Sequence, residues 1–451
     1  MRSSRANVYV DDPNREPGNK AIRVHYAYSG PENAPTLLLM HGNPSWSFLF
    51  REIIPIINAA GYRTVIFDYV GHGRSDKPSR PSDYTYDRQL EWNRQIISSI
   101  DAELGLGRVT LMGHDYGHPF GQRLITHYFQ DRFDGFINAN AGMNRGEVGL
   151  AERHIRWREF ARRNPDVPIG AVICRNAIPQ CPPEVEAGYD APYPGPEYKA
   201  SIRAFPEMVP EDTSWPEARA NQIAWDYMTS QFTKPYMVIW EHWDVPDARK
   251  SRRDEYIEKI PGAYGSENPQ IVSGHYSPED NPEPVAAAVV RFLDDIYTPK
   301  PFVRVLFEDF AAGIDGFSCG GMSCSYDPAE QAVQLRGGEE AASSLVQSDA
   351  MDLSGATELK VAFRYLPDGM AAGDTVLVEL WDGEIYRTIL TLTRAAEPGQ
   401  PDFFNRAPDY GYVRIASDVA PFSKEAKIRI RTKASSPQGG IHLRDIGIFV
   451  R

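Results

Sequence analysis

The stretch LMGHDYGHPFG, residues 111–121, places Asp115 between two glycines where an apolar run gives way to a helix. This is the pattern of a nucleophile elbow, G-x-Nu-x-G, which in most such sequences carries a serine. A carboxylate at this position can attack an sp3 carbon, displace a leaving group and form an alkyl ester with the protein. The residue type at position 115 therefore predicts covalent chemistry at saturated carbon.

Water must then cleave the ester, and this step needs a general base. Proteins with such an elbow carry the triad in the order nucleophile, acid, histidine. His275 follows the last apolar strand pattern, and Asp244 in VIWEHWDVP follows an earlier one, so both fit the order. Glu241 competes with Asp244 as the acid. We favour Asp244 because its spacing places the carboxylate in the loop rather than at the end of the strand.

The oxyanion formed during ester cleavage needs hydrogen-bond donors. We expect the backbone N–H groups of Tyr116 and of Asn43, in the motif HGNPSW, to supply them. The side-chain amide of Asn43 can also donate to a departing anion. An asparagine before Pro44 is in addition a common turn residue, so a purely structural role for Asn43 stays open.

Composition narrows the class of protein and of partner. A chain of 451 residues that is 42% hydrophobic can bury a large core and predicts two domains. The formal net charge of -13 disfavours nucleic acid and anionic membrane surfaces as partners. The first twenty residues lack an apolar core, and no run approaches the roughly 20 apolar residues that span a membrane. We expect a cytoplasmic protein that acts on a small, neutral organic substrate.

The four cysteines fall into two close pairs, Cys174 with Cys181 and Cys319 with Cys324. Each pair could close a short loop as a disulfide, but a cytoplasmic location favours free thiols. The pairs belong to different predicted domains and lack nearby histidine ligands, so we expect no zinc site and no other metal.

The pattern of elements changes near residue 298. Before it, apolar runs alternate with helical patterns, which predicts an α/β domain with a parallel sheet over residues 1–297. A Trp-, Pro- and Arg-rich segment, residues 143–230, interrupts the alternation and predicts a helical cap over the carboxyl ends of the strands. Short alternating runs separated by turns predict a β-sandwich over residues 302–451.

Four motifs together resemble a haloalkane dehalogenase of the α/β-hydrolase superfamily, over nearly all of residues 20–297. They are HGNPSWSFLFREIIP, FDYVGHGRSDKPSRPSDYTYDRQLEW, GHDYG and, in the cap, YDAPYPGPEYKASIRAFPEMVP. The D-x-G elbow is shared with epoxide hydrolases, whereas the combination of HGNPSW, GRSDKP and DYTY is specific. The resemblance implies an α/β-hydrolase fold with a helical cap, and hydrolytic dehalogenation without a cofactor. It implies Asp115 as nucleophile, His275 as base and Asp244 as the partner of the base.

The resemblance also implies two donors that stabilise the leaving halide. The family has a tryptophan directly after the nucleophile, where this chain has Tyr116. The second donor is either the asparagine that matches Asn43 or a cap tryptophan that matches Trp157, and Trp157 is equally well explained as a packed helix aromatic. A further departure is His118, where the family usually has a small residue; its side chain could reach the back of the pocket or be exposed.

Two other functions stay open. A phenol with a tuned pKa can lend a proton to oxygen, so Tyr116 makes an epoxide or lactone hydrolase on the same triad an alternative. Cap tyrosines Tyr189, Tyr193 and Tyr198 would be available for the same task. A non-catalytic binding protein on a hydrolase scaffold is an alternative of another class. It predicts a damaged triad, whereas all three members are present.

The C-terminal domain contains no catalytic constellation that we can find. Its segments VLFEDFAAGIDGF and IHLRDIGIFV resemble jelly-roll modules of the carbohydrate-binding or galactose-binding-like kind. Trp381 and Tyr386 are candidates for glycan contact, although we favour core positions for both. Contact between subunits of a homo-oligomer and covering of the pocket are further roles open to this domain.

Overall fold

The computed structural model describes residues 4–12, 18, 20–175, 177, 181–241, 248–298, 300–321, 323–337, 344–347, 349–394 and 409–451. It divides into two compact units, Met1–Tyr297 and Thr298–Arg451. Among the described residues, no helix is both long and apolar enough to cross a membrane.

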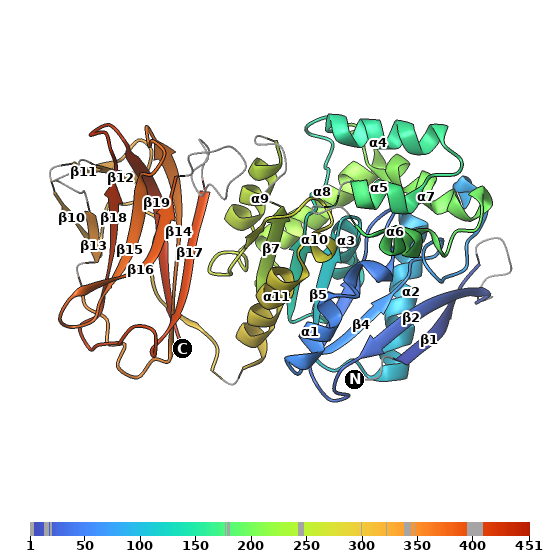
Figure 1. Ribbon diagram of the computed structural model, residues 1–451, viewed down its shortest axis with the longest axis horizontal. Helices are drawn as coiled ribbons and strands as arrows, with labels where there is room; N and C mark the ends of the chain where they lie inside the picture. Colours follow the sequence, from blue (N-terminus) through green and yellow to red (C-terminus); the bar gives the residue numbers. More distant parts are fainter. Residues whose placement is uncertain are drawn as a thin grey trace. The chain divides into compact units, whose positions relative to one another are not determined.

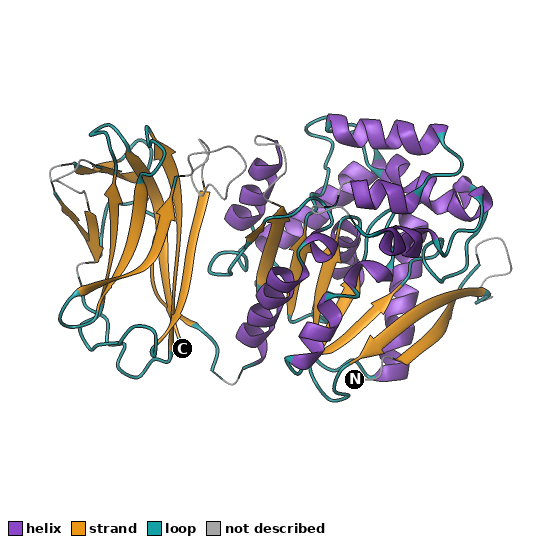
Figure 2. Cartoon of the chain, viewed as in Figure 1, coloured by secondary structure: helices purple, strands orange, loops and turns teal. Residues whose placement is uncertain are grey.

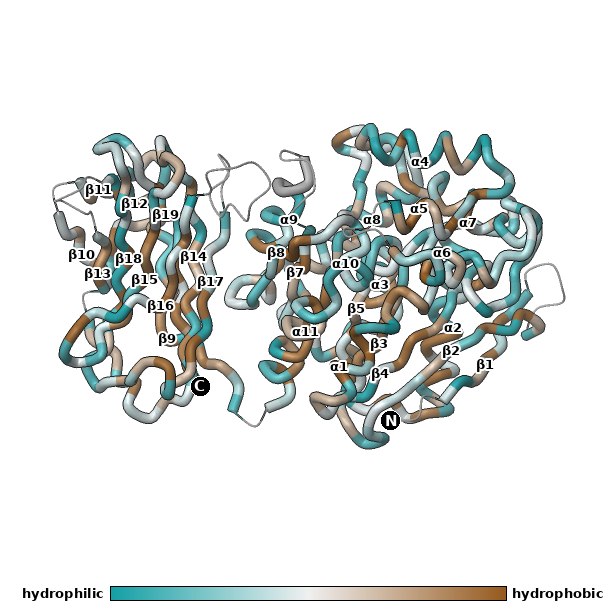
Figure 3. Tube along the Cα trace, viewed as in Figure 1, coloured by the Kyte–Doolittle hydropathy of each residue, from teal (hydrophilic) through white to brown (hydrophobic). Residues whose placement is uncertain are grey.

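An eight-stranded sheet runs through the first unit in the order β1-β2-β4-β3-β5-β6-β7-β8. Strands β3 to β8 pair in parallel, while β2 is antiparallel to both β1 and β4. The central strands are buried along their whole length and colour as hydrophobic in Figure 3, as expected for a parallel sheet covered on both faces. The strands are β1 (Ser4–Val10), β2 (Ile22–Ser29), β3 (Thr36–Met40), β4 (Arg63–Phe67), β5 (Val109–His114), β6 (Gly135–Ala139), β7 (Tyr236–Glu241) and β8 (Gln270–Ile271).

Helices flank this sheet, as the alternating pattern predicts (Figure 1). Helix α1 packs on α11, and α3 packs on both α2 and α8. Helix α2 begins where the Thr85 side chain accepts a hydrogen bond from the Arg88 N–H and ends at Gly105, which has a φ of 57°. The flanking helices are α1 (Ile53–Ala59), α2 (Tyr86–Leu104), α3 (Gly117–Tyr128), α9 (Ala248–Lys259), α10 (Ser277–Asp280) and α11 (Pro282–Tyr297), with 3-10 turns η1 (Ser47–Phe50) and η2 (Pro81–Asp83).

The cap lies between β6 and β7 in the chain. It consists of α4 (Glu152–Arg163), α5 (Ile169–Arg175), α6 (Pro183–Asp190), η3 (Pro196–Lys199), α7 (Ala200–Ala204), η4 (Phe205–Met208) and α8 (Pro216–Ser230). Cap residues such as Ile173, Tyr189 and Ile202 share one hydrophobic cluster with strand residues such as Ile137 and Ile239. The cap therefore packs on the sheet domain as part of the same core.

The second unit is a β-sandwich, which confirms the prediction for this part of the chain (Figure 2). One sheet has the order β10-β13-β18-β15-β16; the other has the order β11-β12-β19-β14-β17, with β9 paired to β19. The strands are β9 (Val303–Glu308), β10 (Phe317–Gly320), β11 (Cys324–Asp327), β12 (Ala332–Arg336), β13 (Ser344–Gln347), β14 (Glu358–Asp368), β15 (Thr375–Trp381), β16 (Tyr386–Thr393), β17 (Asp409–Ala416), β18 (Lys427–Lys433) and β19 (Gly440–Val450).

The core positions that we favour for Trp381 and Tyr386 are wrong. Both side chains are partly exposed and lie outside the hydrophobic core of the sandwich. Their rings lie 5.1 Å apart, and the guanidinium of Arg429 sits 3.7 Å from the centre of the Tyr386 ring. Because they stand at the paired ends of β15 and β16, next to a turn, the two strands expose them.

The expectation of free thiols is also wrong. Cys174 is bonded to Cys181 in the cap, and Cys319 is bonded to Cys324 in the sandwich. Their Cα atoms lie 5.1 and 5.4 Å apart, within the range that a disulfide spans. Our expectation followed from the presumed compartment rather than from the spacing, and the spacing alone allowed both bridges.

Candidate active site

Asp115 lies in the sharp turn between β5 and α3. Its φ of 52° is in the left-handed region, which is uncommon for a residue other than glycine. The flanking glycines are needed for close packing: a Cβ on Gly113 would lie 2.4 Å from the carbonyl carbon of Gly117, and one on Gly117 would lie 2.3 Å from the Met40 oxygen. The surrounding structure thus holds a strained backbone that presents the Asp115 carboxylate at the carboxyl ends of the strands.

The two oxygens of the Asp115 carboxylate have different partners. Oδ1 accepts a hydrogen bond of 2.9 Å from the backbone N–H of Asn43, and Oδ2 lies 3.3 Å from Nε2 of His275. Burial raises the pKa of Asp115, but the hydrogen bond and charge of His275, with smaller effects from His114 and the Asn43 N–H, outweigh it and lower the pKa to about 2. The carboxylate is therefore ionised at neutral pH.

The loop that carries His275 is held by its own backbone. The His275 carbonyl accepts hydrogen bonds from Nε2 of His114 at 2.8 Å and from Nδ2 of Asn140 at 3.0 Å. Asn140 follows β6, and its Oδ1 accepts the N–H of Glu241 at the end of β7 at 2.7 Å. Asn140, which the sequence analysis did not single out, thereby ties the ends of two strands to the His275 loop.

Asp244, the acid that we favour as the partner of His275, lies outside the described residues, so its role stays a prediction. The competing Glu241 is the last residue of β7 and is buried.

Asn43 lies between the sheet domain and the cap. Besides its N–H bond to Asp115, its side-chain Nδ2 donates to the Ile202 carbonyl of α7 at 3.3 Å. Its Oδ1 accepts from Nε2 of His72 at 3.1 Å. Asn43 is joined to Pro44 by a cis peptide bond. It therefore occupies a turn and also contacts Asp115 through its N–H.

The peptide group that joins Gly42 to Asn43 is held from its carbonyl side as well. Nε2 of His41 accepts the N–H of Tyr69 at 3.1 Å, so the proton of this neutral ring is on Nδ1, which donates to the Gly42 carbonyl at 2.7 Å. Burial lowers the pKa of His41, which keeps the ring neutral. His41 thus fixes the plane of the peptide whose N–H points at Asp115.

Tyr116 directs its phenol away from the reacting carboxylate. The hydroxyl donates to the Phe205 carbonyl at 2.6 Å, and the two rings meet edge to face at 5.1 Å. Burial raises the pKa of Tyr116 well above its usual value. The lowered pKa that would let this phenol lend its proton is therefore not found. Its backbone N–H, at the start of α3, belongs to the group of helix N–H donors without a partner inside the helix.

The side chains of Trp157 and His118 both pack against other aromatic rings. Trp157 is partly buried on α4 with its ring stacked on Phe160 at 6.1 Å, and within the described part of the chain it makes no hydrogen bond or ring contact with Asp115 or Asn43. His118 is fully buried, and its Nε2 lies 2.9 Å from the Tyr236 hydroxyl. The expectation of an exposed His118 is therefore wrong, and a place for its side chain at the back of the pocket stays a prediction.

Of the three cap tyrosines, two have hydroxyls bonded to other groups and the third is exposed. The Tyr189 hydroxyl donates to Glu279 at 2.5 Å, Tyr193 accepts the N–H of Gly73 at 3.0 Å, and Tyr198 is exposed. Glu279 lies four residues after His275 and also pairs with Arg51, so this buried contact joins the cap to two segments of the site.

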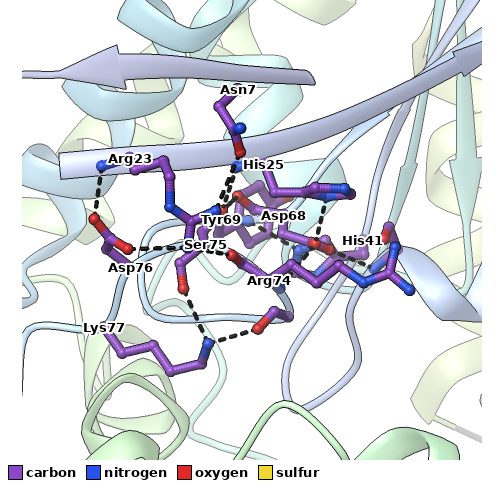
Figure 4. Close-up of polar contacts among 12 residues, drawn as sticks. Asn7, Arg23, His25, His41, Asp68, Tyr69, Arg74, Ser75, Asp76 and Lys77 are labelled. Atoms are coloured by element: carbon purple, nitrogen blue, oxygen red, sulfur yellow. Dashed lines mark hydrogen bonds and ion pairs between the residues drawn. The ribbon is translucent and has the colours of Figure 1, made fainter. Parts of the chain in front are cut away.

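A second group that sequence reasoning missed surrounds Asp68, directly after β4 (Figure 4). This fully buried carboxylate accepts the N–H of Ser47 at 2.8 Å, the N–H of Arg74 at 3.0 Å and Nδ1–H of His25 at 3.1 Å. Burial raises the pKa of Asp68, and the His25 bond with the nearby charges lowers it to about 2. Through Ser47, Asp68 anchors the segment that begins at His41. An acidic residue directly after the apolar run Val-Ile-Phe was the available signal.

The first unit is an α/β hydrolase: it has the parallel sheet, the elbow after β5, a histidine loop after β8 and a helical cap. The family model described as alpha/beta hydrolase fold matches residues 35–166.

Known relatives narrow the class further. A haloalkane dehalogenase of Mycobacterium marinum is 38% identical over 273 residues, which cover 60% of this chain and 89% of the relative. A haloalkane dehalogenase of Psychrobacter cryohalolentis is 35% identical over 289 residues, which cover 64% of this chain and 91% of the relative. A tetrameric haloalkane dehalogenase from Paraglaciecola agarilytica has a TM-score of 0.53 at 26% identity, covering 62% of this chain and 91% of that one. The chain belongs to the haloalkane dehalogenase family, so it is a hydrolase, and the resemblance inferred from the motifs is confirmed.

Proposed function

We propose that this protein hydrolyses the carbon–halogen bond of small haloalkanes through an alkyl ester of Asp115, without a cofactor. The observation that carries the proposal is the ionised Asp115 carboxylate on its strained elbow, with one oxygen on the Asn43 N–H and the other beside His275. The relatives that are 35% and 38% identical support it, because both are haloalkane dehalogenases.

In the first step, one oxygen of Asp115 forms a bond to carbon as the carbon–halogen bond breaks and the halide leaves with the electron pair. Because Oδ1 is bonded to the Asn43 N–H, Oδ2 is the attacking atom. Within the described part of the chain, the Nδ2 group of Asn43 makes one hydrogen bond, a long one of 3.3 Å to the Ile202 carbonyl, so it is the proposed donor to the departing halide. Trp157 stays a predicted second donor.

In the second step, water attacks Cγ of the ester and gives a proton to Nε2 of His275, with Asp244 as the predicted partner of the imidazole. Negative charge develops on Oδ1, where the N–H groups of Asn43 and Tyr116 are the proposed donors. Collapse of this intermediate breaks the bond from Cγ to Oδ2. The alcohol leaves with Oδ2 after taking the proton from His275. Asp115 retains the oxygen of the water, and its remaining proton passes to solvent, which restores the carboxylate.

The other functions have less support. Epoxide or lactone opening would use a tyrosine as proton donor, whereas the Tyr116 hydroxyl is bonded to Phe205 and its pKa is raised. A non-catalytic binding protein does not agree with membership of an enzyme family.

The remaining assignments are proposals about the rest of the chain. Residues 302–451 form an accessory domain, because every proposed catalytic residue precedes residue 298. Contact between like subunits is a proposal for the chain as a whole, because the relative from Paraglaciecola agarilytica is a tetramer. A glycan contact through Trp381 and Tyr386 fits their exposure. The cytoplasmic location stays a prediction, and the two disulfides weigh against it.

The test assays the full chain on 1,2-dibromoethane and on styrene oxide, with bromide and diol as the products measured. We expect bromide release that Asp115→Ala abolishes, and no diol. Asp131→Ala, which removes an exposed carboxylate, is the matched control and should keep activity. Diol without bromide would assign the site to epoxides, and a wild type inert to both compounds would overturn the proposal.

A further inference from the structure

The side-chain amide of Asn43 has only one orientation that fits its two neighbours. One end of the amide lies 3.3 Å from the Ile202 carbonyl, which can only accept a hydrogen bond, so this end is the NH2 group. The other end is therefore Oδ1, and it lies 3.1 Å from Nε2 of His72. Because an amide oxygen only accepts, Nε2 of His72 must carry a proton and donate it.

The burial and the contacts of His72 favour a neutral ring that supplies this single donor. It is fully buried in the loop after β4. Burial lowers its pKa well below the usual value, against a smaller opposite effect of the Val70 carbonyl, so the ring is neutral and has one N–H. Among the described residues Nδ1 has no hydrogen-bond partner, whereas Nε2 faces the Asn43 oxygen, which places the proton on Nε2. The Phe205 ring packs edge-on against the imidazole at 4.7 Å, and the His41 ring lies 5.4 Å away. Its backbone N–H donates to the Tyr69 carbonyl at 2.9 Å. These contacts fix the position from which His72 reaches Asn43.

Without His72, the Asn43 amide would be held in this orientation by the Ile202 carbonyl alone, through a long hydrogen bond of 3.3 Å. A half-turn of the amide would place Oδ1 where Nδ2 now stands, toward the Ile202 carbonyl and the site of the departing anion. Two acceptors would then face each other, and the leaving group would meet a partial negative charge instead of a donor. Among the described residues, His72 is the one donor to Oδ1 of Asn43. Phe205 contacts His72 through its ring, and Ile202 contacts the Asn43 amide through its carbonyl, so neither contact supplies a replacement.

We infer that His72 is a positioning residue for halide release: its Nε2–H holds the Asn43 amide so that Nδ2 faces the leaving group. His41 has the parallel task for the backbone N–H of Asn43, so two neutral histidines orient the two donors of one residue. The inference rests on the proposed dehalogenation. It assigns His72 no contact with substrate and no exchange of protons during the reaction.

The consequence is a dependence on the leaving group. Chloride is a poorer leaving group and a stronger hydrogen-bond acceptor than iodide, so its departure depends more on a correctly oriented donor. Loss of one donor to a developing charge typically lowers turnover about 100-fold to 1000-fold. We expect His72→Leu to lower kcat/KM for 1-chlorobutane by about 100-fold and that for 1-iodobutane far less. A change that merely loosened the fold would affect both substrates equally.

The experiment measures kcat/KM of the full chain on 1-chlorobutane, 1-bromobutane and 1-iodobutane, together with inhibition by added bromide. His72→Gln has an amide NH2 that can donate to Asn43, so it should restore most of the chloride-to-iodide ratio and the bromide inhibition. His127→Leu removes an exposed histidine of α3 and is the matched control, with no expected change in the ratio. In an Asn43→Ala background, His72→Leu should change the ratio no further.

Equal losses on all three substrates, or no loss, would overturn the inference. His72→Met provides a second side chain without a donor. The chloride-to-iodide ratio of kcat/KM must shift in each of His72→Leu and His72→Met that circular dichroism shows to be folded. If neither folds while His72→Gln does, His72 serves folding and the assignment is wrong. A wild type that releases no halide from any of the three would instead overturn the proposed function, which keeps the two failures distinct.

Discussion

Tyr116→Phe removes only the phenol hydroxyl, so it tests whether that hydroxyl makes a structural hydrogen bond or donates to the leaving group during the reaction. Tyr116 is 7% exposed, and its hydroxyl donates to the Phe205 carbonyl at 2.6 Å. Phenylalanine retains the ring and its edge-to-face contact but leaves the carbonyl without this donor. Leaving a buried acceptor unpaired costs about 1–3 kcal/mol of unfolding free energy. We expect a destabilisation in that range.

The same substitution should have little effect on dehalogenation. If the phenol donated to the leaving halide, its loss would cost roughly 2.7–4 kcal/mol of transition-state stabilisation, or about 100-fold to 1000-fold in turnover. Because the proton is directed at Phe205, we expect kcat/KM on 1-bromobutane to stay within about threefold of wild type, less than 1 kcal/mol.

Stability is measured by urea unfolding with tryptophan fluorescence, which reports mainly on the first unit because seven of the eight tryptophans precede residue 298. Tyr128→Phe, at an exposed position on the same helix, is the control and should stay within about 0.5 kcal/mol of wild type. A loss of activity of about 100-fold with unchanged stability would refute the reasoning, because it would make the hydroxyl a donor to the reaction.

Three further predictions concern the carboxylates and the base. His275→Phe should accumulate the Asp115 ester, because attack needs only the carboxylate; intact-protein mass spectrometry after mixing with 1-bromobutane should show one added butyl group, and an unchanged mass would contradict this. Both carboxylate oxygens of Asp68 accept hydrogen bonds, and Asp68→Asn leaves only one acceptor oxygen, so urea unfolding should show a loss of about 2–5 kcal/mol, against little for Asp131→Asn at an exposed position. The pKa of Asp115 is lowered from 3.8 to about 2, so its ionisation adds about 2 kcal/mol of stability above pH 3.8 that is lost as the pH falls through 2. The halide burst in stopped-flow experiments should accordingly keep its rate constant down to about pH 4, and a fall centred near pH 4 would show an ordinary carboxyl group.

The elements that the sequence predicted best are those specified by neighbours along the chain. The elbow could be predicted because Gly113, Asp115 and Gly117 lie within five residues and the glycines are needed wherever such a turn packs on a sheet. The sheet, the cap and the sandwich follow from the spacing of apolar runs over ten or more residues. These features depend on local geometry and on burial, and both are visible in a single sequence.

The features that were missed depend on contacts between distant segments. The hydrogen bond from Tyr116 to Phe205 joins residues that are 89 positions apart. The residue type at position 116 does not reveal whether its hydroxyl faces a carbonyl or a leaving group. His118 is buried against Tyr236, 118 residues away, so its neighbours on α3 gave no indication. The same applies to the Asn43 amide, whose orientation follows from one residue of the loop after β4 and one of the cap.

The central claim is that the alcohol takes its oxygen from Asp115 and not directly from water. The measurement is a single turnover of 1-bromobutane in water enriched in oxygen-18, with the full chain in excess over substrate, followed by mass spectrometry of butanol and of the tryptic peptide 109–123. The account predicts unlabelled butanol and one oxygen-18 in the peptide that contains Asp115. Labelled butanol from an unlabelled peptide would mean that water attacks the carbon directly, and it would contradict the covalent route.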